Sequence, residues 1–174
     1  MRAGKKTGQT LGRKGGTEGR REHRLKCGIF WMYVCILLRL IVFKYPWEQM
    51  RETMRTWQRG VILEGLDTAN FTLFATIRMY VKYADRLNSF ENLAGNVLLF
   101  LPLGFLLPWV WRGMRRWRRT LAAAFLCSAG IELFQLFSAF GAFDVDDLLL
   151  NCAGAMLGFG LWHSCGRVRL NACR

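Results

Sequence analysis

Three stretches of the chain are almost free of charge and long enough to cross a lipid bilayer. Residues 92–111 include 20 residues without a charge, residues 120–140 carry only Glu132, and residues 148–165 carry no charge. Because a helix rises about 1.5 Å per residue, about 20 apolar residues span the hydrocarbon core. The pattern predicts three transmembrane helices.

A fourth apolar stretch, residues 27–43, is shorter and is interrupted by Arg39. It has the length of a signal peptide's apolar region, but no small-residue cleavage site follows it. Arg39 lies close enough to the far end for its guanidinium to reach the interface. We therefore expect an uncleaved membrane anchor.

The long connection, residues 44–91, divides into two parts. Residues 47–65 place Glu and Arg at helical spacing, whereas residues 71–83 combine four aromatic residues with two bases. The second part is typical of a helix that lies at the headgroup level, although a short re-entrant segment has the same pattern. The predicted fold class is an all-α polytopic membrane bundle, with about four transmembrane helices and an interfacial helix in the external loop.

Charge is distributed unevenly along this chain, which is 52% hydrophobic and has a net charge of +13. Nine bases lie in residues 1–26, five in residues 112–119 and three after Cys165, whereas residues 141–147 carry three acids and no base. Bases concentrate on the cytoplasmic side of a membrane. We therefore predict cytoplasmic N- and C-termini and no nucleic-acid partner.

The basic segment, residues 1–26, has too few apolar residues to fold alone, so we expect a disordered cytoplasmic tail. It acts either as a topology signal alone or also by attraction to anionic headgroups. Residues 166–174 form a second tail. The six cysteines lie within or beside the predicted spans and form no CxxC pair, so we expect neither disulfides nor a metal, and no cofactor.

Polar residues recur in the apolar stretches at spacings that place them on common helix faces. A charge at the bilayer centre costs about 2.5 to 3.5 kcal/mol on insertion scales, so these side chains should face one another. The candidate functional cluster consists of Asn92, Asn96, Glu132, Gln135, Asp144, Asp146, Asp147 and Asn151.

Two members of this cluster have competing interpretations. A neutral Glu132 hydrogen-bonded to Gln135 or Asn96 would lock helices together, whereas a proton-transferring or substrate-contacting Glu132 would be functional. Asp144 fits the N-cap of the last helix, with Asp147 at the third helical position. A hard-oxygen metal site is the alternative, but the Gly and distal Glu of a calcium loop are missing.

Small residues indicate close helix packing. Gly154 and Gly158 form a GxxxG motif in the apolar stretch 148–165. Gly95 and Gly104 lie in the apolar stretch 92–111. The motif does not distinguish packing within one chain from a homo-oligomer. Pro102 and Pro108 lie inside the span 92–111, where a kink is expected and a break is not.

These residues carry a resemblance to the VanZ-like family of bacterial membrane proteins, over roughly residues 70–162. The similar segments are NLAGNVLLFLPLGFLLP at 92–108, IELFQLF at 131–137 and FDVDDLLLNCAG at 143–154, preceded by NFTLFATI at 70–77. Family members usually have Pro where Leu73 stands, and many have a base before the acidic motif, where this chain has Phe140-Gly141-Ala142.

The resemblance implies a multi-pass protein of the bacterial cytoplasmic membrane with a role in the cell envelope. The member that gives the family its name is associated with low-level resistance to teicoplanin, a lipid-tailed glycopeptide, whereas most members have no assigned biochemistry. Fold-level similarity does not transfer a reaction. Two other hypotheses stay open: an enzyme acting on lipid or cell-wall precursor through Glu132, Asp144 and Asp147, and a small proton-coupled transporter subunit that uses Glu132. A lipid-linked or lipophilic ligand is the expected partner.

Overall fold

The computed structural model describes residues 8–42, 48, 51–52, 55, 65–67, 69–83, 89–138 and 143–172, and within these it omits the side chains of residues 8–17, 42, 89–92 and 167–172. Most of the predicted helix at 47–65 and residues 1–7 therefore lie outside the described residues. The elements are α1 (Gly8–Val42), α4 (Ala75–Lys82), α5 (Ser89–Val110), η1 (Arg112–Arg115), α6 (Trp117–Ser138) and α7 (Val145–Ala172). The described part of the chain is all-helical, as predicted.

Three of these helices, α5, α6 and α7, are long and apolar enough to cross a membrane. They coincide with the three nearly uncharged stretches of the sequence. In hydrocarbon a helix satisfies its backbone hydrogen bonds internally, which is why such stretches fold as helices. The helix α5 continues through Pro102 and Pro108 without a break.

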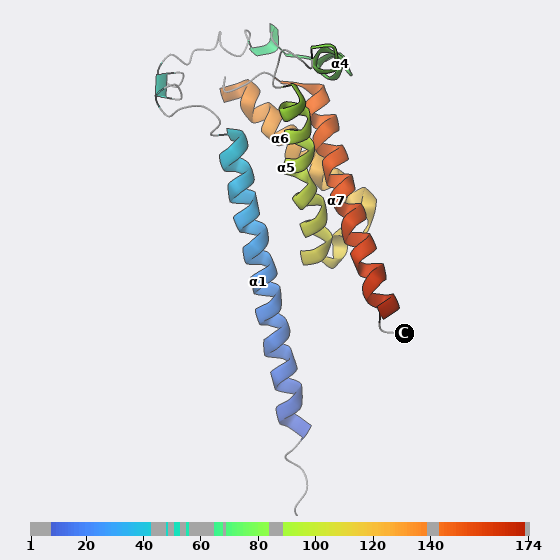
Figure 1. Ribbon diagram of the computed structural model, residues 1–174. Helices are drawn as coiled ribbons and strands as arrows, with labels where there is room; N and C mark the ends of the chain where they lie inside the picture. The colour runs from blue at the N-terminus through green and yellow to red at the C-terminus, as the bar shows by residue number, and fades with distance from the viewer. Residues whose placement is uncertain are drawn as a thin grey trace, which may run out of the picture.

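The helices α5 and α7 lie side by side with their backbones in close contact (Figure 1). A Cβ added at Gly158 would lie 1.9 Å from the carbonyl oxygen of Leu101, and one at Gly154 would lie 2.1 Å from that of Val97. Gly104 makes the reciprocal approach, to the Ala155 carbonyl. The GxxxG motif therefore packs helices of one chain together.

Gly95 differs from the other three glycines expected to mediate packing. A Cβ at this position would meet no described atom within 4 Å. Close packing at Gly95 is therefore not found within the described chain, because this face of α5 does not turn toward α7. The sequence could not show this, since the orientation of the helix depends on the partner it packs against.

The apolar half of α1 packs against α5 and α6. Phe30 and Leu37 are buried in the shared core, and the Phe30 ring meets Trp111 edge-to-face with 4.7 Å between ring centroids. The Tyr33 hydroxyl donates a hydrogen bond of 2.6 Å to the carbonyl oxygen of Leu99. Near the end of α5, the Lys26 ammonium lies 5.3 Å from the centre of the Trp109 ring. Residues 26–37 of α1 therefore run alongside α5.

Residues 8–26, for which the sequence predicts a disordered tail, belong to the helix α1 in the structure. Once the apolar half of a helix is nucleated by packing, each added residue extends it at little cost. Glu22 and Lys26 assist by forming an ion pair of 2.6 Å across one turn. The helix extends beyond the rest of the bundle (Figure 1), and its side chains from Glu18 to Leu25 are exposed.

The exterior of the bundle is apolar, unlike that of a water-soluble bundle. Large apolar side chains lie on the outside of α5, α6 and α7, with exposed fractions of 62% for Leu98, 69% for Leu126 and 58% for Leu157. Among the side chains that the structure describes, the buried polar ones are those of Thr120, Ser128, Glu132, Asp146 and Asn151. Apolar side chains cover the exterior at no cost only where lipid replaces water.

Substitution of Gly158 tests the contact between α5 and α7. We expect Gly158→Ala to lower the free energy of unfolding by about 1–3 kcal/mol, because the new methyl group overlaps the backbone of α5. Gly160→Ala is the matched control, since a Cβ there meets nothing within 4 Å and alanine favours the helix. Thermal unfolding of the purified protein in detergent measures both. Equal stability of the two variants would contradict the packing.

Candidate functional site

The candidate polar residues gather at the end of the bundle where α5 and α7 begin and α6 ends. The helix α4 lies across this end (Figure 1). Residues 69–74, which precede α4, approach the start of α7 through a parallel backbone bridge between Asn70 and Asp144. The Asn70 N–H donates to the Phe143 carbonyl at 2.8 Å, and the Val145 N–H donates to the Asn70 carbonyl at 3.1 Å.

Asp146 is fully buried and binds the N-terminus of α4. One carboxylate oxygen accepts the N–H of Phe74 at 2.6 Å, and the other accepts the N–H groups of Thr76 at 2.9 Å and Ile77 at 3.2 Å. These N–H groups belong to the first turn, where a helix has no internal acceptors. A carboxylate on α7 therefore supplies the cap of α4.

The residue at the N-cap position of α4 is Phe74, which has no side-chain acceptor to offer. Its backbone is left-handed, with φ of 65°, an unfavourable conformation for a residue with a Cβ. The three hydrogen bonds to Asp146 offset this strain. The negative charge also lies at the positive end of the helix dipole.

Asp144 occupies the N-cap position of α7, as the sequence predicts. Its Oδ1 accepts the N–H of Asp146 at 2.8 Å and the side-chain amide of Asn70 at 3.0 Å. Its Oδ2 accepts the hydroxyl of Thr76 at 2.5 Å. Asp144 thereby caps its own helix and also holds the segment before α4, a second task that spacing alone does not show.

Glu132 is buried and its Oε2 accepts the backbone N–H of Asp144 at 3.1 Å. Neither Asn96 nor Gln135, the partners expected from the sequence, donates a hydrogen bond to Glu132. The amide of Asn96 donates to Oδ1 of Asp147 at 2.5 Å. The half-buried side chain of Gln135 makes no hydrogen bond among the described residues. The reason is position, because Glu132 lies less than two turns before the end of α6 and thus meets the start of α7.

A second polar pair lies one helical turn deeper. The Asn151 amide donates to the Ser128 hydroxyl at 2.9 Å, and both side chains are buried. The Asn151 Oδ1 atom is buried without a hydrogen-bond partner among the described groups. Sequence reasoning missed Ser128, although it precedes Glu132 by four residues. It also missed Asn70 and Thr76, while the Asn92 side chain lies outside the described residues.

The arrangement is rich in hydrogen-bond acceptors, and its donors are backbone N–H groups, amides and a hydroxyl. Among the residues the structure describes, no three His, Cys, Asp or Glu side chains are arranged to hold a metal ion. The oxygens of Asp144 and Asp146 are already engaged by protein donors. Chemically, the cluster fixes α4 and residues 69–74 against the bundle.

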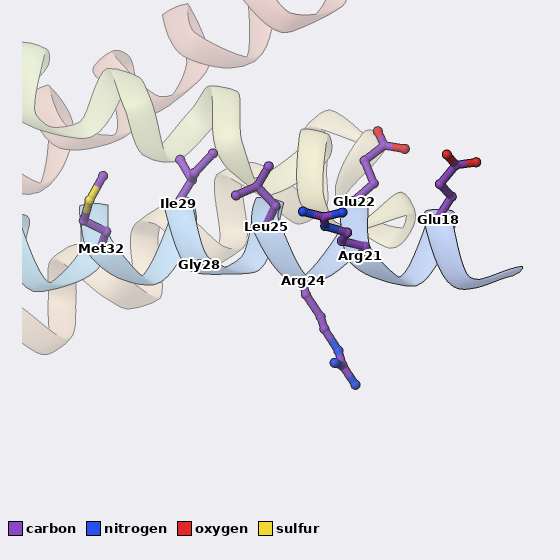
Figure 2. A pocket seen from close by; sticks show the side chains of 8 residues that line it. All are labelled: Glu18, Arg21, Glu22, Arg24, Leu25, Gly28, Ile29 and Met32. Atoms are coloured by element: carbon purple, nitrogen blue, oxygen red, sulfur yellow. The ribbon is translucent and has the colours of Figure 1, made fainter. Parts of the chain in front are cut away.

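A separate hollow of about 850 Å³ runs along the N-terminal part of α1. Figure 2 shows Glu22, Leu25 and Ile29 extending to one side of the helix, whereas Arg24 extends to the opposite side. The described lining comes from α1 alone, so no second element brings polar groups toward a ligand there. This hollow is therefore not the candidate site.

A model of the VanZ/LLP1 family matches residues 30–166 of the chain, which include all of the hydrogen-bonded cluster and most of the apolar half of α1. No curated protein matches the chain, and neither does any solved structure.

Substitution of Asp146 tests its role as the cap of α4. We expect Asp146→Ala to lower stability by about 1–3 kcal/mol, because three N–H groups lose their acceptor. Trypsin should then cleave faster at Arg78 and Lys82, the exposed bases of α4. Asp67→Ala, at an exposed acid, is the control. Unchanged cleavage kinetics in Asp146→Ala would refute the capping role.

Proposed function

The chain belongs to the VanZ/LLP1 family, and on this premise we propose that it is a multi-pass protein of the bacterial cytoplasmic membrane that contributes to antibiotic tolerance. Teicoplanin-type glycopeptides, which carry a lipid tail, are the drugs we assign to it. The observation that carries the proposal is the family match over residues that form one connected polar cluster at one end of an apolar bundle.

We place four transmembrane helices in this membrane, with α1 as the first. Two observations support α1 as a transmembrane helix. Its residues from Lys26 to Leu37 run alongside α5. Its side chains Trp31, Ile36 and Leu40 are exposed. Such exposed side chains suit contact with acyl chains.

The same arrangement supports an orientation. The bases of η1 and the start of α6 lie at one end of the bundle and the acids at the start of α7 lie at the other (Figure 1). By the positive-inside rule the basic end is cytoplasmic, and so are both termini. The acidic cluster and α4 then face the outside.

The helix α4 lies in the outer headgroup layer in this proposal. Phe71, Leu73, Met79 and Val81 are exposed large apolar residues on or just before it, and Arg78 and Lys82 are exposed bases. This composition is typical of interfacial helices. Because Asp146 fixes the start of α4, the helix presents a positioned apolar and basic surface to a lipid-tailed or lipid-linked ligand.

The alternative functions have less support from the contacts. An enzyme would need at least one reactive carboxylate, yet Asp144 holds two side chains and one backbone N–H, and Glu132 accepts the N–H of Asp144. A transporter built as a homodimer through GxxxG would need a free motif, but Gly154 and Gly158 pack against α5 of the same chain.

Drug susceptibility tests the function. Expression of the wild-type chain in a susceptible bacterium should raise the inhibitory concentration of teicoplanin, and Asp147→Asn should abolish that increase at equal protein abundance. The substitution keeps one oxygen for Asn96 to donate to, removes the charge and replaces the other carboxylate oxygen by an NH2 donor. Asp67→Asn, which makes the same charge change at an exposed site, should behave as wild type. No effect of the wild type would end the proposal.

Cysteine labelling tests the orientation. In a cysteine-free background, a membrane-impermeant maleimide added to intact cells should label Asp67→Cys but not Gly19→Cys or Gly113→Cys. The latter two should react only after permeabilisation. Both glycines have room for a side chain, since no described atom lies within 3.4 Å of an added Cβ. Labelling of both Gly19→Cys and Asp67→Cys from outside would show that α1 does not cross, and labelling of Gly19→Cys alone would reverse the proposed orientation.

A further inference from the structure

A second hollow, of about 600 Å³, lies at the end of the bundle opposite the acidic cluster. It is formed by the end of η1, the start of α6 and the C-terminal half of α7, three segments that lie close together in the fold. Its lining includes Arg115, Arg116, Arg118, Arg119, Phe159 and His163. Four arginines therefore lie on the lining of an open hollow that has the volume of a small-molecule site.

Aromatic rings and a backbone carbonyl hold three of these arginines without neutralising them. The Arg115 guanidinium lies 5.7 Å from the centre of the Trp162 ring, and that of Arg118 lies 5.4 Å from the Trp117 ring. Arg119 donates a hydrogen bond of 3.2 Å to the Gly113 carbonyl. No carboxylate in the described part of the chain forms an ion pair with any of the four.

The surroundings of the hollow are amphipathic. On α7, the His163 ring is nearly parallel to Phe159, at 6.4 Å between centroids. On α6, Trp117 is half-exposed at the rim, and Phe125, two turns further along the same side, is also exposed. The four positive charges therefore adjoin an apolar strip that leads toward the middle of the bundle.

We propose that this hollow binds the phosphate-bearing headgroup of an anionic phospholipid, with an acyl chain along Trp117 and Phe125. Guanidinium forks match phosphate oxygens in pairs, and basic pockets between transmembrane helices suit such headgroups. The assignment of this lipid to the cytoplasmic leaflet rests on the orientation proposed above. A free phosphate shares the chemistry of the headgroup, but it has no acyl chain to contact Trp117 and Phe125.

The test measures binding of fluorescent phosphatidylglycerol to the purified full-length protein in neutral detergent, by fluorescence anisotropy. Arg116→Gln/Arg118→Gln should weaken binding by roughly thirtyfold, because two of the four charges are lost. The matched control is Arg20→Gln/Arg24→Gln on α1, which removes the same charge from exposed positions outside this hollow. The control should stay within about twofold of wild type.

Two outcomes would overturn the proposal. Equal loss in the test and control pairs would indicate diffuse attraction to a basic protein, with no site. Displacement of the labelled lipid by millimolar inorganic phosphate as complete as that by unlabelled phosphatidylglycerol would assign the hollow to free phosphate. Phosphatidylcholine should compete poorly, since its headgroup carries no net charge, and competition equal to that of phosphatidylglycerol would also count against the proposal.

The experiment distinguishes a loss of lipid binding from a loss of folding, and its result does not depend on how the protein is oriented in a membrane. If the double variant does not elute as one species, Arg116→Gln is compared with Arg24→Gln, with an expected loss of roughly fivefold. Detergent removes any dependence on membrane orientation, so a failed labelling experiment leaves this result unchanged. Loss of tolerance to teicoplanin is likewise not part of the measurement.

Discussion

Polar groups inside an apolar, lipid-facing bundle must find partners within the protein, and the structure depends on this constraint. Hydrocarbon offers neither donors nor acceptors, so an unpaired polar group there costs several kcal/mol. The chain meets the constraint by placing Glu132 and Asp144 at an end of the bundle where backbone N–H groups of helix starts are free to donate. These two acids are stabilised by backbone N–H groups at the start of α7.

The short acidic motif at the start of α7 illustrates how three neighbouring carboxylates serve three different elements. Asp144 caps α7 itself, Asp146 caps α4, and Asp147 accepts a hydrogen bond from Asn96 on α5. Successive residues at a helix start project about 100° apart, so each can address a different neighbour. One segment thereby fixes the positions of three helices, which explains why the short helix α4 is attached to the bundle.

The spans were predictable because length and apolar composition determine them locally, as residues 92–111 and α5 show. Capping by Asp144 was also predictable, because the N–H group that its side chain accepts belongs to Asp146, only two residues later in the sequence. The role of Asp146 was not, because its donors lie about 70 positions away and no spacing rule reaches that far. The extent of α1 was missed for a related reason: the helix begins in a basic segment of poor propensity that the packing of its other half stabilises.

The two ends of the bundle handle charge in opposite ways, and this difference bears on what each end can bind. At the acidic end the described oxygens of Asp144 and Asp146 receive hydrogen bonds from the chain, so that end is closed upon itself. At the basic end Arg115 and Arg118 lie against aromatic rings, which orient a guanidinium but leave its charge in place. A positive-inside signal needs only the number of bases. Aromatic rings also orient the Arg115 and Arg118 guanidiniums, and this is the feature on which the proposed anion site rests, whereas the acids have found their partners within the chain.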